Sequence, residues 1–243
     1  MPPSTPLTQF LNAHFAGPVD SFLAALHVHP TYPQAPINDT FAMELLVFAG
    51  LLLFFLIVRI SLDVEQPNPA QHLAEGIHGF ASDTSESIVG HHFERFVSFV
   101  TVLGLFILLC NLLGLVPGLK SPTADVVVPF GCAIVTFVYY HYQGIRQHGF
   151  GYIKQFLGPV WWMAWLMLPL EIISHMARVL SLTVRLYANI FAGDLVTLAF
   201  FSLIPVVIPL MFISLHIMVA VVQAFLFMAL ALSYLSLASS EEH

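Results

Sequence analysis

The sequence predicts an all-α integral membrane protein with about five membrane helices and a further amphipathic helix on the membrane surface. Of its 243 residues, 58% are hydrophobic and only 9% are charged, and the mean hydropathy is +0.86. Soluble domains carry roughly 25% charged residues, so this composition is typical of a chain that lies in a bilayer. The net charge is −7 and there is no basic run, which argues against a nucleic-acid partner.

The first part of the chain divides into a leading segment and three apolar stretches. Residues 1–40 are mixed and rich in proline, and we expect them outside the bilayer or on its surface. The expected spans are 41–60, 96–116 and 125–142, close to the ~20 residues that cross a ~30 Å hydrocarbon core. Between the first two spans, apolar residues recur at helical spacing among polar ones, which predicts the surface helix. These residues are Ala70, Leu73, Ala74, Ile77 and Ala81.

The last third is almost continuously apolar from Pro159 to Ser240, with Pro205 and Pro209 near its midpoint. A helix of about 40 residues is about 60 Å long, twice the thickness of the hydrocarbon core. Each half therefore holds either two short spans or one helix that lies steeply across the bilayer. Neither half has a polar break of loop length, so we expect a long, tilted hairpin of helices 159–203 and 206–238. The membrane domain would then cover residues 41–243.

The basic residues of the loops predict the orientation in the membrane. With five spans, four of them fall on one side, namely Arg59, Arg95, Arg146 and Lys154, and only Lys120 falls on the other. Cytoplasmic loops carry the excess of Lys and Arg. We therefore expect the N-terminus outside and the C-terminus in the cytoplasm.

Arg185 is the residue that points to function, because a permanent cation is hard to keep in this segment. The only other charged residue between Leu180 and Phe201 is Asp194. A guanidinium does not lose its proton in a protein, and holding one at bilayer depth costs roughly 2.5–3.5 kcal/mol on insertion scales. Charged residues in membrane segments usually mark an ion pathway or a counter-charge.

Polar and small residues share the face of the helix on which Arg185 lies. Steps of three and four residues place them on one side of a helix with 3.6 residues per turn, and the opposite side is apolar. This face, called the Arg185 stripe below, consists of Glu171, Ser174, Arg178, Ser181, Arg185, Asn189 and Ala192.

Folding the hairpin about Ile204–Pro205 predicts which residues of the two helices lie at the same level. Arg185 comes level with Gln223, and Asp194 comes level with a position close to His216. Asp194 lies about half a turn round the helix from Arg185, so we expect no simple ion pair between them. Carboxyl and imidazole groups in a wet membrane crevice can both exchange protons.

These positions predict an outer half-channel at Asp194 and His216, a barrier at Arg185, and an inner exit past Arg178 and Glu171. Arg185 cannot carry protons, so its role must be electrostatic: a carboxyl group that approaches it is driven to release its proton. No acid of this chain lies level with Arg185 on a facing helix. The acceptor carboxylate must therefore come from another subunit.

Several motifs resemble subunit a of F-type ATP synthases. Ser181–Leu195 reads SLTVRLYANIFAGDL, and Gln223–Ala238 reads QAFLFMALALSYLSLA before an SSEEH tail. Asn111–Gly118 (NLLGLVPG) and Pro122–Val126 (PTADV) are similar to a further region of that family. The resemblance covers residues 38–243.

The resemblance implies a stator subunit of the Fo sector in a bacterial inner membrane, which couples hydrogen ion transport to ATP synthesis. It implies a ring of c subunits, b-type peripheral stalk subunits and the lipid bilayer as partners. We expect no cofactor and no catalysis by this chain, which has no G-x-x-x-x-G-K-[ST] loop.

Carried over position by position, the resemblance assigns roles to single residues. Arg185 would be the essential arginine, with Asn189 and Gln223 as its polar neighbours. Asp194 and His216 would be the outer acid and histidine. Arg178 and Glu171 match positions that are often basic and acidic, respectively, and we also count Ser181 among the translocation residues.

Simpler interpretations stay open for several of these residues. Arg178 could extend towards an interface, Asn189 and Gln223 could serve helix packing, and Glu171 could be a solvated acid at a helix end. We interpret Asp125 as a loop or helix-start acid. Four histidines outside the hairpin lack metal-ligand spacing on a common helix face and are interpreted as surface residues; they are His91, His92, His141 and His148.

Two other classes of protein are alternatives. A self-contained proton-coupled secondary transporter should show internal repeats and broken helices. We find no repeat in the sequence, and the acceptor acid is missing. A membrane metalloenzyme would need paired ligands such as H-E-x-x-H, which the sequence lacks.

Overall fold

The computed structural model describes residues 5–25, 36–63, 67–90, 92–116, 118–149, 164–201 and 207–239. All regular secondary structure in these residues is helical, which confirms the predicted all-α class. The helices are α1 (Pro6–Ala25), α2 (Asp39–Ile60), α3 (Pro69–Val89), α4 (Glu94–Leu113), the 3₁₀ turn η1 (Pro122–Ala124), α5 (Val127–His148), α7 (Ala164–Phe201) and α8 (Val207–Ser239).

Four of the described helices, α2, α4, α7 and α8, are long and apolar enough to cross a membrane, which fits an integral membrane protein. Helix α5 is less apolar because its last turns, from Gln143 to His148, are polar. It runs beyond the expected end at Tyr142 and stops at Gly149, whose φ of +56° favours glycine. The division of the chain at residue 40 into a surface segment and a membrane domain stays a prediction.

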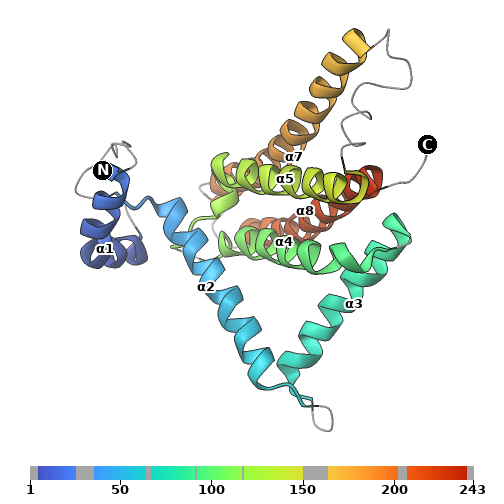
Figure 1. The fold of residues 1–243 in the computed structure, drawn as a ribbon. Helices are drawn as coiled ribbons and strands as arrows, with labels where there is room; N and C mark the ends of the chain where they lie inside the picture. The colour runs from blue at the N-terminus through green and yellow to red at the C-terminus, as the bar shows by residue number, and fades with distance from the viewer. Residues whose placement is uncertain are drawn as a thin grey trace.

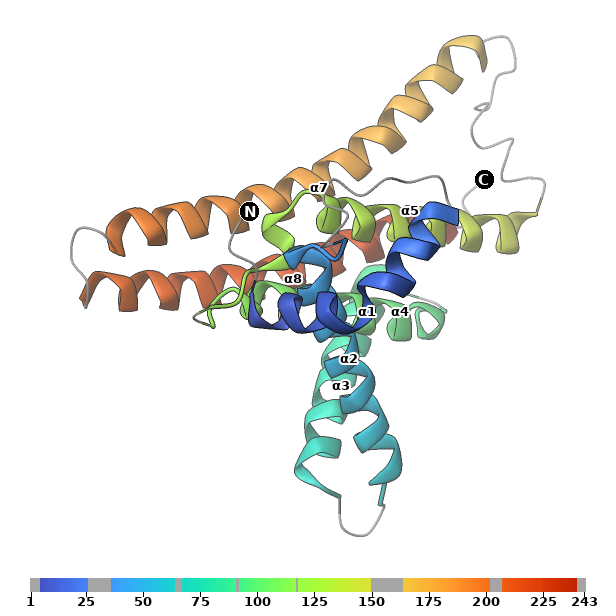
Figure 2. The same ribbon diagram turned by 90° about the vertical axis from the view of Figure 1, so that its left-hand side faces the viewer.

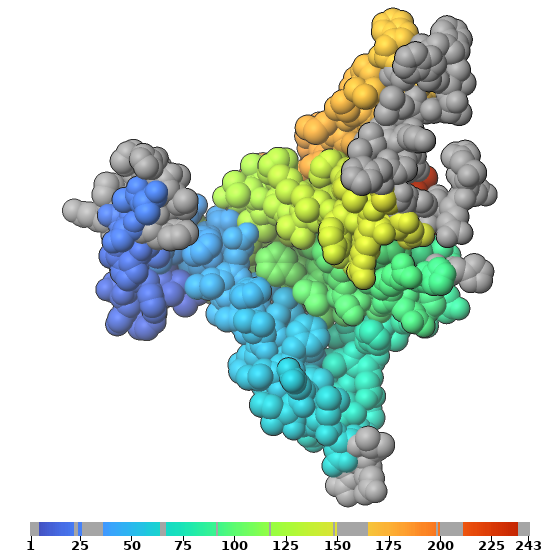
Figure 3. Space-filling view, in the orientation of Figure 1, coloured from blue at the N-terminus to red at the C-terminus, as the bar shows by residue number. Residues whose placement is uncertain are grey.

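Helix α8 lies at the centre of the molecule, where it contacts α3, α4, α5 and α7 (Figure 1). The core between these helices is apolar: Leu186 and Ile190 of α7, Phe227 of α8 and Ile107 of α4 are all buried. The connected ends of helices α2 and α3, called the α2–α3 lobe below, project from one side of the bundle, while the rest of α3 packs against α4 and α8 (Figure 3). The start of α7 projects from the other side.

Helices α7 and α8 form the long hairpin that the sequence predicts (Figure 2). They have 38 and 33 residues, or about 57 and 50 Å at the rise of an α-helix. The two helices run antiparallel and side by side near their connection, and they separate towards the start of α7. The expected turn at Ile204–Pro205 lies outside the described residues, as do Lys154 and the tail Glu241–His243.

Helix α1 lies in the leading proline-rich segment, for which the sequence analysis gave no helix. Pro18 lies inside this helix. Two contacts fix its start to the rest of the chain. The Thr5 amide donates to Asp39 Oδ1 (3.0 Å), and the Asn12 side chain exchanges two hydrogen bonds with the backbone of Ile37 (both 3.1 Å). The leading segment is thereby held against the start of α2.

Helix α3 occupies the position of the predicted surface helix, but part of its apolar side faces the protein. Ala81 is buried in a cluster with residues of α4 and α8, whereas Leu73 and Phe80 are exposed. The apolar residues of α3 therefore divide between the bundle and the exterior. Its place on a membrane face stays a prediction.

Candidate ion-translocation site

Asp194 of α7 and His216 of α8 lie next to each other in the structure. The distance from Asp194 Oδ1 to His216 Nδ1 is 3.8 Å, which is a close approach but longer than a hydrogen bond. The His216 side chain is 6% exposed and that of Asp194 is 41% exposed. The hairpin thus brings together a buried imidazole and an accessible carboxyl group at one level.

Gly193 makes room for the imidazole ring. A Cβ atom at this position would lie only 3.2 Å from His216 Nδ1 and 3.4 Å from His216 Cε1. Any other residue would push the ring away or force α7 and α8 apart. The sequence analysis gave Gly193 no role, although its position directly before Asp194 was a signal that could have pointed to it.

A cavity of about 680 Å³ lies on the side of Asp194 that faces the α4–α5 loop. Asp194, His216 and Thr197 of the hairpin line it together with Lys120 and Asp125 of that loop. The lining includes two carboxyl groups, an ammonium group and an imidazole. A cavity with such a lining can hold water.

Asp125 has two contacts in this region. Its Oδ1 accepts from the Val127 amide (3.3 Å), so it is the helix-start acid that the sequence suggested. Its Oδ2 accepts from the Thr40 hydroxyl (3.1 Å), and the neighbouring Lys120 pairs with Asp39 (3.2 Å). The sequence analysis did not predict that Asp125 and Asp194 line the same cavity, because they are far apart along the chain.

A second cavity, of about 240 Å³, lies along the hairpin and is lined by His216, Gly193 and Asn189. The His216 ring therefore borders both cavities. Its Nε2 is buried without a hydrogen-bond partner among the described residues. Buried polar atoms of this kind are usually paired, and a water molecule in the cavity would satisfy this one.

Asn189 and Gln223 form a direct hydrogen bond between α7 and α8. Asn189 Nδ2 donates to Gln223 Oε1 at 2.6 Å, and Gln223 is buried. The sequence analysis placed Gln223 level with Arg185, whereas the structure bonds it to the residue one helical turn further along. The cause is the register of the hairpin, which differs from the assumed one by two residues at the Asp194–His216 contact and by four at the Asn189–Gln223 contact.

Arg185 of α7 is half-buried at the edge of the bundle. Its Nη2 is 3.4 Å from Ser181 Oγ, one turn back along the stripe, and it has no ion pair among the described residues. The neighbouring Leu180 and Val184 are exposed. The Arg185 guanidinium thus lies next to an apolar surface of α7, formed by Leu180 and Val184, that the described part of this chain does not cover.

The other end of the Arg185 stripe contains a second group of contacts. Glu171 Oε1 lies 3.1 Å from His175 Nε2, and the Tyr140 hydroxyl of α5 forms a hydrogen bond with His175 Nδ1. The guanidinium carbon of Arg178 lies 5.2 Å from the centre of the Tyr234 ring on α8, a cation–π contact. Sequence reasoning missed His175 and Tyr140, although Glu171 and His175 have the i, i+4 spacing of paired residues.

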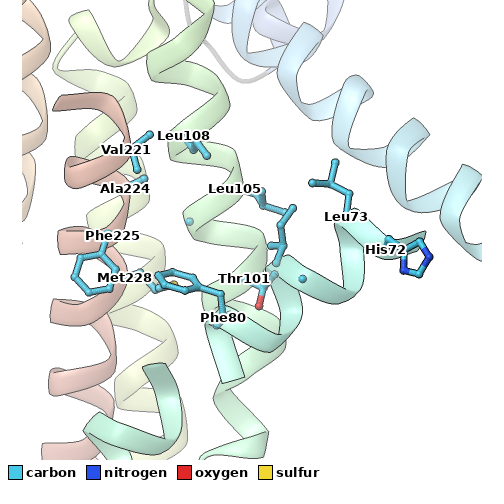
Figure 4. A pocket seen from close by; sticks show the side chains of 14 residues that line it. His72, Leu73, Phe80, Thr101, Leu105, Leu108, Val221, Ala224, Phe225 and Met228 are labelled. Atoms are coloured by element: carbon cyan, nitrogen blue, oxygen red, sulfur yellow. The ribbon is translucent and has the colours of Figure 1, made fainter. Parts of the chain in front are cut away.

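A third cavity, of about 400 Å³, lies between α3, α4 and α8 and is almost entirely apolar (Figure 4). Its polar residues offer little to a proton: the Thr101 hydroxyl donates to the Val97 carbonyl of its own helix, and His72 points away at the rim. The cavity contains no carboxyl group. The two cavities at His216 are therefore the better candidates for an ion path.

Comparison with known proteins shows the family of this chain. The protein-family model described as ATP synthase A chain matches residues 41–236. The chain belongs to this family. The subunit a of Koribacter versatilis ATP synthase is 50% identical over the full length of both chains. Those of Solibacter usitatus and Geotalea uraniireducens are each 39% identical, over 96% and 84% of this chain and 99% and 89% of theirs.

Membership of the ATP synthase subunit a family confirms the resemblance seen in the sequence. Together with the long apolar helices, it identifies the chain as a membrane subunit of a bacterial ATP synthase, which connects it with ATP synthesis and proton transport. The positions of Arg185, Asn189 and Asp194 all fall within the matched range. The roles of single residues follow below as proposals.

Proposed function

We propose that this chain is the proton-translocating stator subunit of the Fo sector, with two offset half-channels separated by Arg185. The observation that carries the proposal is the arrangement of α7 and α8. A carboxyl–imidazole pair lies at one level, where Asp194 borders one cavity and His216 borders two. At another level lies a half-buried arginine without an ion pair among the described residues.

The outer half-channel runs through the two cavities that border His216. Protons reach Asp194 through the larger cavity, whose wall also carries Asp125 and Lys120. They pass to the imidazole of His216 and continue into the smaller cavity at Asn189. The distance of 3.8 Å between Asp194 and His216 allows transfer after a small movement or through one water molecule.

Arg185 separates the two half-channels and acts on a carboxyl group supplied by a partner. A carboxyl group brought within ~4–6 Å of a guanidinium favours its ionised form, so it gives up its proton as it arrives. The fixed charge also repels free cations, which prevents a direct leak. Each proton that crosses ~100 mV supplies about 2.3 kcal/mol to the rotation of the partner.

The partner that fits this geometry is a ring of c subunits carrying acidic groups, which would lie along the exposed face of α7. Peripheral stalk subunits of the b type would bind elsewhere on the chain. The N-terminus lies outside and the C-terminus in the cytoplasm. The inner half-channel leaves past Arg178 and Glu171, at the other end of the Arg185 stripe, while Ser181 lies beside the arginine.

The proposal is tested by the variants Arg185→Ala and Arg185→Lys in the whole ATP synthase complex, in inverted membrane vesicles. We expect both to lose ATP-driven proton pumping. Passive proton leak should be greater in the Ala variant, because that change removes the positive barrier. Arg59→Ala, which removes an arginine at the end of α2, is the matched control and should pump normally. Pumping near the wild-type level in Arg185→Ala would remove this arginine from the mechanism.

A further inference from the structure

A second cluster of ionisable side chains lies where α5 crosses α7, at the end of the Arg185 stripe opposite to Asp194. His175 is at its centre, ten residues before Arg185 and thus about 15 Å from it along the helix axis. The His175 side chain is buried, whereas that of Glu171 is 42% exposed. The cluster therefore joins the interior of the bundle to an accessible carboxyl group.

Both ring nitrogens of His175 are engaged. Nδ1 forms a hydrogen bond with the Tyr140 hydroxyl, and Nε2 lies 3.1 Å from Glu171 Oε1. A carboxylate can only accept, so Nε2 carries the proton that points at Glu171. In the neutral ring Nδ1 is then an acceptor, and the Tyr140 hydroxyl donates to it. The tyrosine thus holds the histidine in the tautomer that donates to the acid.

Other groups surround the ring but leave this bond pattern intact. His141 of α5 lies beside His175, with 4.9 Å between ring centres, so the interpretation of His141 as a surface histidine is wrong. The His141 side chain is half-buried because α7 crosses over this part of α5. Arg178, one turn after His175, is directed over the Tyr234 ring rather than towards Glu171. The acid is therefore bound by the histidine and not by the nearest arginine.

We propose that His175, held by Tyr140, is a positioning residue for the inner half-channel, where it orients Glu171 to exchange protons with the cytoplasmic side. This inference rests on the proposed function and adds two residues to it. An oriented N–H donor keeps the carboxylate in one place, where it can accept a proton and pass it on. Glu171 remains accessible on its other side, which lets the proton leave to water.

The test compares His175→Leu, His175→Gln and Tyr140→Phe in the whole complex, in inverted vesicles whose cytoplasmic face is turned to the medium. ATP-driven proton pumping is measured at several pH values of the medium, with the lumen strongly buffered. We expect His175→Leu to slow pumping by about tenfold, the effect of losing one hydrogen bond to a charged group, and to shift its dependence on medium pH. The amide of His175→Gln can still donate to Glu171, so this variant should recover most of the rate.

The control for Tyr140→Phe is Thr136→Val, one turn earlier on the same buried side of α5. The Thr136 hydroxyl donates only to the Cys132 carbonyl of its own helix. Tyr140→Phe should shift the pH dependence because it releases the tautomer of His175, whereas Thr136→Val should leave it unchanged. The amount of each variant in the complex is measured by co-purification. If His175→Leu fails to assemble, the His175→Gln and Tyr140→Phe results test the inference.

Two results would overturn the inference. One is an unchanged pH dependence in Tyr140→Phe, and in His175→Leu where that variant assembles. The other is pumping in assembled His175→Gln that is about tenfold slower than in the wild type, which would mean that donation to Glu171 is not what matters. Either result, combined with loss of pumping in Arg185→Ala, would leave the proposed function intact. Normal pumping in Arg185→Ala would instead count against the proposed function itself.

Discussion

Gly193 contributes to the site through the side chain it lacks. Gly193 lies against the His216 ring of α8, and this contact sets how closely the ring can approach Asp194, the neighbour of Gly193 on α7. Protein interiors are close-packed, so a single added methyl group at such a contact must be accommodated by a shift of its neighbour. A residue of no chemical reactivity thereby influences the geometry of the pair to which we assign proton transfer.

We expect Gly193→Ala to slow ATP-driven proton pumping several-fold while the complex still assembles. The added Cβ would lie 3.2 Å from His216 Nδ1, so the ring must move by a few tenths of an ångström. Gly131→Ala is the matched control, because a Cβ there meets no atom within 4 Å. Equal pumping rates in the two variants, measured in inverted vesicles, would show that the space at Gly193 is not needed.

The loop between α4 and α5 is the element that forms one wall of the larger cavity at Asp194, and it is held by a buried polar network. Ser121 Oγ donates to the Cys110 carbonyl (3.0 Å), and Thr123 Oγ1 donates to Asn111 Oδ1 (2.6 Å). Gly114, just after α4, allows the loop to fold back this closely. The wall that carries Lys120 and Asp125 is therefore built on the end of α4.

Gly114→Ala should destabilise this element. Its Cβ would lie 2.7 Å from Ser121 Cβ and 3.3 Å from the Ser121 amide nitrogen, and the backbone there cannot easily move. We expect a loss of about 1–3 kcal/mol, the usual range for overpacking, seen as a lower midpoint of thermal unfolding in detergent. Gly104→Ala, whose Cβ would meet Met228 at an ordinary 3.6 Å, should change the midpoint little. A similar midpoint in both variants would contradict the close approach of the loop.

At the scale of the whole molecule, two surfaces face in different directions. The exposed side of α7 near Arg185 includes Val184, and α2 includes the exposed Leu53. Helix α7 and the α2–α3 lobe lie on different sides of the bundle (Figure 1). Both surfaces are apolar, so hydrophobicity does not distinguish a lipid-facing surface from a partner-facing one. The proposed function assigns the ring to the surface that carries the arginine.

Cross-linking distinguishes these two surfaces. In the whole complex, Val184→Cys should form a disulfide with a cysteine introduced on the outer face of the ring subunit, whereas Leu53→Cys should not. The native Cys110 and Cys132 are buried and should not interfere. Cross-linked products are measured by gel electrophoresis after mild oxidation. A cross-link from Leu53→Cys in place of Val184→Cys would place the ring on the wrong side of this chain.

The amino-acid sequence by itself determined the helical class, the long hairpin and the Arg185 stripe. Each of these depends on a pattern that is local to the chain: an apolar run of given length, or a repeat of 3.6 residues. Helix α1 was not predicted, because prolines are more typical of irregular segments. In the structure Pro18 lies inside this helix. Asp194 and His216 could be placed close together because the two prolines near the midpoint of the apolar run indicate the register of the hairpin to within a few residues.

Only the tertiary structure decided which side chains meet across helices. The partner of Gln223 is Asn189 rather than Arg185, the partner of His175 is Tyr140, and Asp125 shares a cavity with Asp194. These pairings depend on how far two packed helices slide along and rotate about each other. A slide of one turn, about 5.4 Å, replaces every partner while leaving each helix and its sequence pattern unchanged.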